Sequence, residues 1–314
     1  MKRFLSQATL FFLLLAGSLI YAAFFVPSRE MRESMLQMVP IKNAMLRDTP
    51  SPRIIFVGGS NLSMGLNSEA IAKAFEMPVV NMGLHGGLGL LYMLNEVQPY
   101  VRRGDIVVLV PEYEHFHGNL FYGNKEVLGV AFDIMPEKRC QIGFVQWIYL
   151  TKFVPNYAAK KLYYLVVNVF DGHSPSAVDA CNDFNSYGDY IGHWYQNSET
   201  VIPLQPSEHP ESLRSKYFEV VEGFVREIRS KDAQIFILPP CLQATSYDNM
   251  RFLIVMVENE YRNRGLPLIA STSRYRMADE LCSGTPYHLN KKGVDERTRM
   301  LIRDLSNAPF KSAL

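Results

Sequence analysis

The stretch IIFVGGSNLSMGLNS, residues 54–68, joins a short apolar run to a glycine pair and then to Ser60. The run at 53–57 lies between Pro52 and Gly58, and its length and β-branched residues predict a buried strand. Glycine lets the backbone turn sharply, so the strand would end by presenting the Ser60 hydroxyl. Taken alone, the same residues are also typical of an ordinary turn.

Strand-like and helix-like segments alternate after this stretch. Further strands are expected at 78–81, 105–110, 234–238 and 266–269, and helices at 68–75, 87–101, 211–230, 247–264 and 292–305. This alternation predicts an α/β fold, a three-layer doubly wound parallel sheet of the flavodoxin-like kind. Ligands of such sheets bind beyond the carboxyl ends of the strands, so the segments after Val57, Val80, Val110 and Leu238 should line one rim.

The composition is that of a packed globular protein. The 314 residues are 48% hydrophobic and 20% charged, with a formal net charge of +1. Basic residues are scattered rather than clustered, so nothing indicates a nucleic-acid partner.

The N-terminus predicts a membrane anchor. Lys2 and Arg3 precede an uncharged apolar stretch at 9–26, which is long enough for a bilayer core at ~1.5 Å per residue. The preceding positive charge favours an N-in orientation, which predicts a single-pass protein of the bacterial inner (cytoplasmic) membrane with a periplasmic domain. A cleaved signal peptide is the alternative.

We therefore expect an anchor or signal at 1–28, a linker at 29–50 and an α/β domain at 51–308. An aromatic-rich insertion at about 115–210 would cover the rim of the sheet, since it is too long for a structureless loop. Its aromatic rings would stack on sugars or form a small core of their own. Within it, Asp189 and His193 occupy a polar, glycine-broken segment that would supply a substrate contact, a replacement acid or simply a hydrogen-bonded loop.

Four cysteines, Cys140, Cys181, Cys241 and Cys282, are compatible with an extracytoplasmic compartment. They allow three disulfide pairings, and free buried thiols are the alternative. Their spacings do not resemble a zinc site, and we expect neither a metal nor a cofactor.

Two further segments could act together with Ser60. The stretch NMGLHGG at 81–87 follows the second expected strand, and a glycine there leaves N–H groups free for an oxyanion. The stretch PYHLNKKG at 286–293 places His288 in an expected loop before the last helix. A serine needs a base to become a useful nucleophile, and histidine is the usual one near neutral pH.

These three segments, in this order, resemble the SGNH hydrolase family, also called GDSL-type esterases. The resemblance covers roughly residues 53–113 and 211–305. The arrangement of these segments along the chain is similar to that of the membrane-anchored members of the family that accompany polysaccharide or teichoic-acid acylation. It implies that Ser60 is the nucleophile, His288 the base and Gly83 an oxyanion donor. Gly59 and Asn61 would lie beside the oxyanion.

The chain departs from the family pattern at three places. Gly59 stands where the family has Asp, Glu112 follows the third strand where an oxyanion Asn is usual, and Thr285 replaces the Asp three residues before His288. Because the acid chiefly orients the imidazole, a Ser–His pair still works without it. Asp279 is a possible replacement acid, and Glu112 is alternatively structural.

The resemblance implies an O-acyl, chiefly O-acetyl, esterase or acyltransferase acting on a cell-envelope or exported polysaccharide. The alternative, favoured by the missing Asp and Asn, is a non-catalytic accessory protein that binds polysaccharide or a membrane-bound O-acyltransferase.

Overall fold

The structure, a computed structural model, describes residues 1–32, 34–171, 181–206 and 212–308. The chain divides into two compact units. The helical unit comprises Met1–Gln37 and Asn124–Cys181, and the sheet unit comprises Met38–Gly123 and Asn182–Leu314. The middle of the expected insertion therefore groups with the N-terminal helix, whereas its two ends, as far as they are described, belong to the sheet unit.

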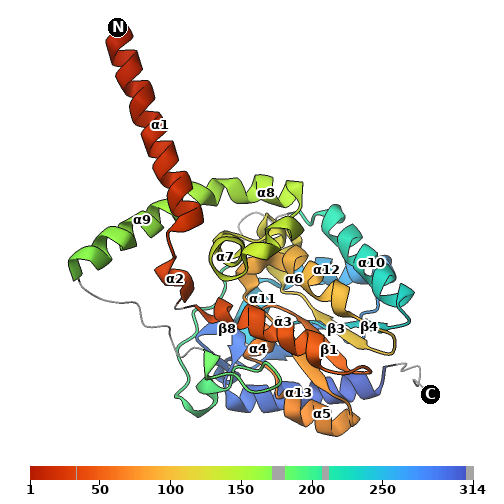
Figure 1. The fold of residues 1–314 in the computed structure, drawn as a ribbon. Coiled ribbons are helices and arrows are strands. Elements are labelled where there is room, and N and C mark those ends of the chain that lie inside the picture. The colour runs from red at the N-terminus through yellow and green to blue at the C-terminus, as the bar shows by residue number, and fades with distance from the viewer. Residues whose placement is uncertain (33, 172–180, 207–211, 309–314) are drawn as a thin grey trace. The chain divides into compact units, whose positions relative to one another are not determined.

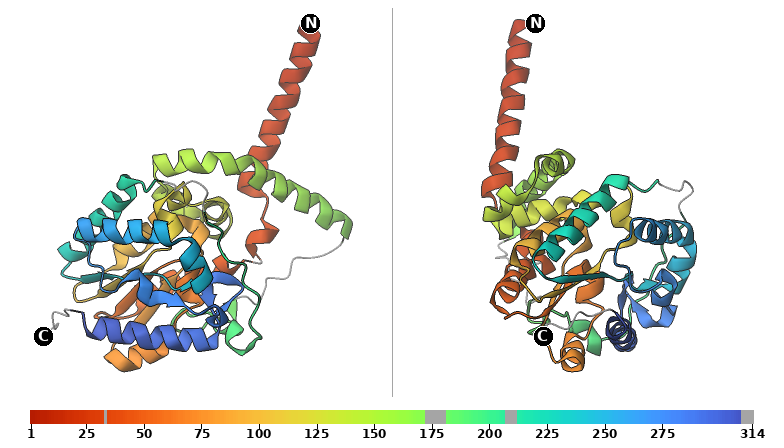
Figure 2. Two further views of the ribbon diagram at one scale, coloured as in Figure 1. Left: turned by 180° about the vertical axis from the view of Figure 1, so that it is seen from behind. Right: turned by 90° about the vertical axis from the view of Figure 1, so that its right-hand side faces the viewer.

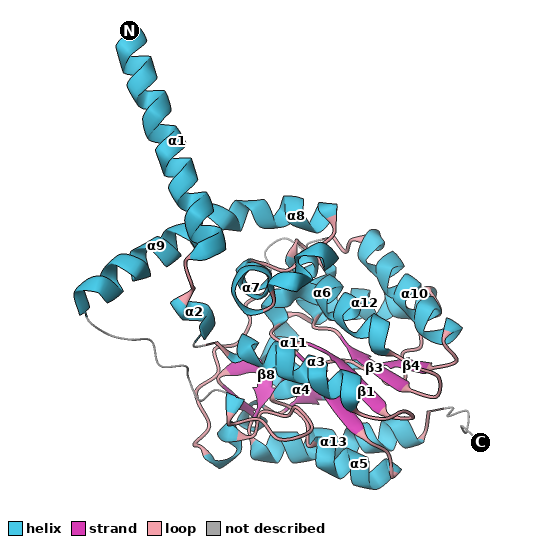
Figure 3. Ribbon diagram, viewed as in Figure 1, coloured by secondary structure: helices cyan, strands magenta, loops and turns pink. Residues whose placement is uncertain are grey.

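The sheet unit contains a parallel sheet of four strands, which confirms the α/β class (Figure 3). The strands are β1 (Ile54–Gly58), β2 (Val79–Gly83), β3 (Ile106–Val110) and β4 (Gln234–Ile237), in the order β2-β1-β3-β4. Ile54 of β1 lies opposite Val79 on one side and Ile106 on the other. Of the strand expected at 266–269, only a bridge between Leu268 and Ile237 of β4 forms.

Both faces of this sheet are buried. Ile54 and Phe56 of β1 point into a core that they share with Ile71 and Leu301 from two helices. The alternate residues Ile55 and Val57 are also fully buried. Successive side chains of a strand point to opposite faces, so the sheet is covered on both, which explains why its strands are continuously apolar.

Eight α-helices of the sheet unit are α3 (Met38–Asp48), α4 (Ser60–Ser63), α5 (Ser68–Phe75), α6 (Gly89–Val97), α10 (Ser215–Ser230), α11 (Ala244–Asn249), α12 (Arg251–Asn263) and α13 (Lys291–Ser306). The Asn67 side chain caps α5 by accepting from the Ala70 N–H at 3.1 Å. The helix expected at 247–264 is two helices, α11 and α12. The helix expected from 211 begins at Ser215, and residue 211 itself lies outside the described residues.

Two small sheets complete this unit. β5 (Leu242–Gln243) pairs with β6 (Arg276–Met277), and β7 (Cys282–Ser283) pairs antiparallel with β8 (Thr285–Leu289). His288 thus lies on a strand rather than in the expected loop. The four cysteines are all unpaired in the structure.

The helical unit is built around α1 (Lys2–Phe25) and α9 (Val154–Asp171), with α2 (Arg29–Arg32), α7 (Lys125–Gly129), the π-helical turn η6 (Val130–Ile134) and α8 (Phe144–Leu150). Ala22 and Ala23 of α1 pack against Ala158 of α9, and these small side chains let the two helices approach closely. The buried Lys161 of α9 donates to the Ala23 carbonyl at 2.9 Å and pairs with Asp133 at 3.0 Å.

One segment, Lys2–Met31, is long and apolar enough to cross a membrane by its length and composition. Most of the side chains of α1 are exposed, with burial confined to Ala22 and Ala23 at its C-terminal end. A helix that is apolar all round and unburied by its own chain is what a membrane span requires.

Candidate active site

Ser60 stands at the position where the order of the strands reverses. β1 has β2 on one side and β3 on the other. The chain runs from β1 to β2 on one side and then crosses back to β3 on the other side of β1. In open parallel sheets the crevice beyond the carboxyl ends of strands at such a switch point is the usual ligand site. Ser60 is the second residue after the end of β1 and opens the short helix α4.

The two glycines before Ser60 are required by close packing. A Cβ at Gly58 would lie 2.5 Å from the Val110 carbonyl oxygen, where β1 and β3 end side by side. A Cβ at Gly59 would overlap the carboxylate of Glu112. The glycine pair therefore admits Glu112 to the rim beside Ser60.

Ser60 and His288 meet although 228 positions separate them. The distance from His288 Nε2 to Ser60 Oγ is 2.9 Å, and both residues are partly exposed. With its proton on Nδ1, the neutral imidazole accepts the Ser60 hydroxyl hydrogen through Nε2. This is the arrangement of a serine with a general base.

The surroundings of His288 keep its imidazole neutral. Burial, assisted by the nearby His193 and His85, lowers the pKa of His288 to about 4. The carboxylate of Glu112 acts in the opposite direction and favours the protonated imidazole. At neutral pH the ring is therefore free to take a proton, and Glu112 supplies the negative charge that would stabilise it afterwards.

Two buried side chains, Asn61 and Arg297, hold Glu112 in place. The Asn61 side-chain amide donates to Glu112 Oε1 at 3.0 Å, and Asn61 Oδ1 accepts from the Arg297 guanidinium of α13 at 3.0 Å. Asn61 and Arg297 are both almost fully buried. Asn61, the residue predicted to lie beside the oxyanion, has its side-chain amide bonded to Glu112 and is fully buried.

Two further contacts hold the strand that carries His288. The Tyr287 hydroxyl donates to Glu114 Oε2 at 2.5 Å, which ties β8 to the segment after β3. Burial raises the pKa of Glu114. On the other side of His288, His193 Nε2 lies 2.9 Å from the Leu289 carbonyl oxygen, so His193 supports the backbone of β8. Of the three roles considered for His193, this contact is that of a hydrogen-bonded loop residue, and the side chain stays partly exposed.

Gly83 differs from the expected oxyanion donor. Its N–H donates to Asn81 Oδ1 at 2.8 Å, and its carbonyl accepts from both Ser63 and Lys42. A Cβ at Gly83 would lie 2.5 Å from the Ser63 backbone nitrogen. Glycine is therefore needed here because α4 packs directly on the end of β2.

Lys42 forms a second serine–base pair beside the first. Its Nζ donates to Ser63 Oγ at 2.8 Å and lies 5.2 Å from the centre of the Phe184 ring. Burial lowers the pKa of Lys42 to about 7, while the charge of Asp189 opposes this shift. Both members of the pair are buried, so the pair has no access to substrate.

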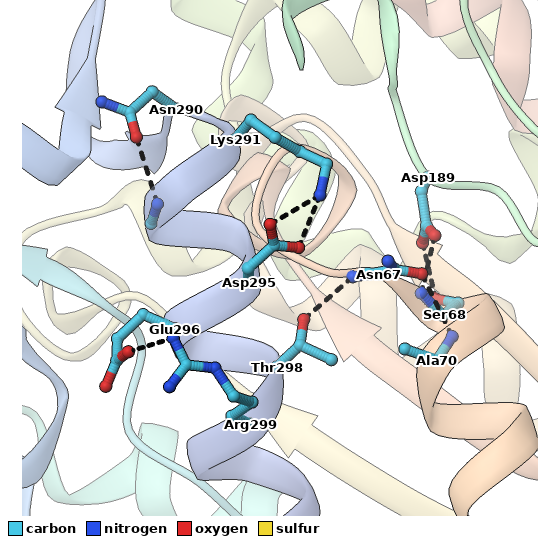
Figure 4. A network of polar contacts seen from close by, with 11 residues as sticks. Asn67, Ser68, Ala70, Asp189, Asn290, Lys291, Asp295, Glu296, Thr298 and Arg299 are labelled. Atoms are coloured by element: carbon cyan, nitrogen blue, oxygen red, sulfur yellow. Dashed lines mark hydrogen bonds and ion pairs between the residues drawn. The ribbon is translucent and has the colours of Figure 1, made fainter.

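Asp189 belongs to a buried structural network (Figure 4). Its carboxylate accepts from the Ser68 N–H at 2.8 Å and the Ser68 hydroxyl at 2.5 Å, and from the Asn81 amide at 2.8 Å. These bonds connect the start of α5 to the middle of β2. Asp189 is fully buried and therefore does not serve as a substrate contact.

Asp279 also has a structural partner. Its carboxylate accepts from the Thr245 N–H at 3.0 Å and from the Thr245 hydroxyl, at the beginning of α11. These bonds do not involve His288, and the carboxylate that acts on His288 is Glu112. The position of Glu112 two residues after the third strand is the sequence signal for its presence at the rim, whereas nothing in the sequence signals the pairing of Lys42 with Ser63.

Within the described part of the chain, no group of three or more His, Cys, Asp or Glu side chains could hold a metal ion. The chemistry available at this rim is that of Ser60, His288 and Glu112. Comparison with known proteins adds no further assignment, since neither a family model nor a curated protein matches the chain.

Proposed function

We propose that this protein is a membrane-tethered, extracytoplasmic O-acyl esterase or acyltransferase with a three-layer SGNH-like sheet domain. The observation that carries the proposal is the 2.9 Å contact between His288 Nε2 and Ser60 Oγ at the switch point of a parallel sheet. A base with a burial-lowered pKa next to a partly exposed hydroxyl is an arrangement suited to nucleophilic catalysis. By the family resemblance, the substrate is an O-acetylated cell-envelope or exported polysaccharide.

The proposed reaction proceeds through an acyl-serine. Ser60 Oγ attacks the acyl carbonyl carbon while its proton passes to His288 Nε2, and the charge of Glu112 stabilises the imidazolium. Collapse of the tetrahedral intermediate breaks the ester bond, and the imidazolium returns its proton to the departing alcohol. Water or a sugar hydroxyl then attacks the acyl-serine and gives its proton to Nε2. The bond between the acyl carbon and Ser60 Oγ breaks, and the imidazolium returns the proton to Ser60 Oγ, which restores the hydroxyl and the neutral imidazole.

The oxyanion donors of this site differ from those of the resembling family. The Ser60 N–H at the start of α4 remains a candidate donor. The Gly83 N–H is bonded to Asn81, so substrate binding would have to release it before it could serve. At Glu112 the chain has a carboxylate in place of the family's amide, and this negative charge repels a developing oxyanion. Water or a cationic group of the substrate would be a better neighbour for the Glu112 carboxylate.

That carboxylate is the observation that favours the alternative function. A rim with Glu112 where a donor is expected suits an accessory protein that binds polysaccharide, or a membrane-bound O-acyltransferase, without turning substrate over. The two functions differ in the reactivity of Ser60.

The test is labelling of the full-length protein by a fluorophosphonate, followed by hydrolysis of an aryl acetate. Ser60→Ala should abolish both signals, and His288→Ala should abolish labelling while leaving the hydroxyl in place. Ser63→Ala is the matched control, since its hydroxyl lies three residues away and is buried. Absence of labelling in a folded wild-type sample would overturn the esterase proposal and favour the accessory function.

A further inference from the structure

The helical unit has an apolar surface that the other helices of this unit do not cover. Phe144, Val145 and Ile148 of α8 are 80%, 50% and 54% exposed, while Gln146 and Leu150 are buried. A helix at the surface of a water-soluble unit normally turns polar residues outward. In α8 the exposed side is the apolar one.

α9 carries a similar surface on one of its sides. Pro155, Ala159, Leu162 and Val166 recur at helical spacing and form an uncharged stripe, with Val166 55% exposed. The nearly opposite side is polar, since Lys160 pairs with Glu30 at 3.5 Å. The two sides of α9 therefore face surroundings of different polarity.

The contacts of α9 indicate the direction in which each side faces. Arg29 lies 5.9 Å from the Tyr164 ring, and Glu30 contacts Lys160. Both residues follow the C-terminal end of α1, so the polar side of α9 faces away from α1's N-terminal part. The apolar stripe then faces towards the apolar length of α1.

The level at which α9 crosses α1 matches the edge of a bilayer. α9 packs on Ala22 and Ala23, and the α8–α9 pair crosses the C-terminal end of α1 in both views (Figures 1 and 2). The distance along α1 from Lys2 to Ala22 is ~30 Å at ~1.5 Å per residue, which is the thickness of a hydrocarbon core. If α1 spans the membrane, α9 lies at its outer interface.

Side chains suited to that interface gather at the same place. Trp147 is half-exposed on α8, and Tyr163 of α9 is exposed. The Arg139 guanidinium stacks on Phe24 of α1 at 5.3 Å from the ring centre, and Lys152 is exposed between α8 and α9. Aromatic rings and long basic side chains are the usual residues of the headgroup region.

We propose that α8 and the apolar stripe of α9 form a membrane foot, which lies in the lipid interface of the bilayer that α1 spans. The occupant of this apolar surface is lipid, at the boundary between headgroups and acyl chains. The inference rests on the membrane tether of the proposed function and does not depend on the chemistry of Ser60. It implies a second attachment that fixes the orientation of the helical unit relative to the membrane.

The test is quenching of tryptophan fluorescence by brominated phosphatidylcholine in the full-length protein reconstituted into vesicles. Trp147 and Trp194 are the two tryptophans of the chain and are first replaced by phenylalanine. Single tryptophans are then introduced by Ile148→Trp in the foot, Leu13→Trp in α1 and Phe252→Trp on α12. Phe252 is the matched control, because it is 64% exposed in the sheet unit.

We expect the tryptophan of Ile148→Trp to lose most of its fluorescence with lipid brominated near the headgroup and less with lipid brominated near the chain end. Leu13→Trp should show the reverse preference, and Phe252→Trp should stay unquenched. If the fluorescence of Leu13→Trp is quenched and that of Ile148→Trp is not, the membrane foot is overturned while the membrane tether is left intact. That result would point to a protein partner on this surface. Absence of quenching at both positions would overturn the tether as well. Equal quenching of Ile148→Trp and Phe252→Trp would also overturn the foot, because it would reflect nonspecific contact with lipid.

Discussion

Two serine–base pairs lie three residues apart in α4, and they differ in access and in the direction of the hydrogen bond. Ser60 Oγ is 2.9 Å from His288 Nε2 and Ser63 Oγ is 2.8 Å from Lys42 Nζ. Burial lowers the pKa of both bases, to about 4 for His288 and about 7 for Lys42. Ser60 and His288 are partly exposed, whereas Ser63 and Lys42 are 3% and 1% exposed.

The comparison shows that a serine next to a base with a shifted pKa is not sufficient for a site. The Ser63 hydroxyl donates to the Gly83 carbonyl and receives a bond from Lys42, so its proton is already engaged. The Ser60 hydroxyl can donate to His288 from the rim of the sheet. The Ser63–Lys42 pair fastens α4 to β2, whereas the Ser60–His288 pair lies at the rim of the sheet, where the proposed chemistry would take place.

The largest expected effect concerns turnover. Replacing Ser60 by alanine should lower ester hydrolysis by ~10³-fold or more, because a nucleophile acts together with its base as one unit. Ser63→Ala should keep turnover per folded molecule within a few-fold of wild type. Initial rates with an aryl acetate, normalised to folded protein, measure both, and equal losses in the two variants would abolish the distinction between the pairs.

The second prediction concerns the stability of the buried pair. The folded-state pKa of Lys42 is about 7 against an ordinary value of 10.5. Between these values the unfolded chain binds the proton and the folded chain does not, so the free energy of unfolding should rise with pH, at most by about 1.4 kcal/mol per unit. Lys42→Met removes this rise. Urea unfolding of both proteins at a series of pH values measures the difference, and parallel curves would contradict the shifted pKa.

The third prediction concerns the pH dependence of the partly exposed pair, Ser60 and His288. The base must be neutral to accept the Ser60 proton, and the pKa of His288 is lowered to about 4. The kcat/KM for an acyl ester should therefore stay level as pH falls below 6.5 and decline only near 4. A decline centred near 6.5, the ordinary value for histidine, would show that burial does not control this imidazole.

The smallest effect is expected from Glu112→Gln. Glu112 raises the pKa of His288, so removing its charge should move the acidic limb of kcat/KM to lower pH. The glutamine retains an oxygen for the Asn61 amide and thus preserves the packing. The same pH profile serves as the measurement. An unchanged or raised limb would exclude Glu112 as the carboxylate that acts on His288.

Periodicity and position alone indicated much of the fold. Short β-branched runs bounded by glycine and proline indicated the four strands, and both faces of the resulting parallel sheet are buried. The boundaries of α5 also follow from local chemistry, since Asn67 is a good N-cap. The pairing of Ser60 with His288 is an implication of the family resemblance, since His288 lies on β8, outside the parallel sheet.

The structure alone showed which hydrogen-bond partners the other predicted site residues have. The Gly83 N–H is taken by a side chain two residues earlier, and Asp189 serves the start of α5. Asp279 serves the start of α11. A local pattern predicts which polar groups lie near a rim, but their partners come from distant segments, and each buried polar group bonds whichever partner the packing supplies.

The amino-acid sequence by itself determined the four strands of the parallel sheet and most of the helices around it, because strand and helix periods, caps and turns depend on neighbouring residues. It also indicated that the Ser60 hydroxyl follows the first strand and that the His288 imidazole lies shortly before the last helix. Only the tertiary structure decided that Ser60 contacts His288 at a partly exposed position while Ser63 contacts Lys42 in the core. It also decided that Glu112 is the carboxylate whose charge acts on the His288 imidazole. The physical reason is that burial and long-range contacts set both pKa and access, and neither is a property of a short stretch of chain.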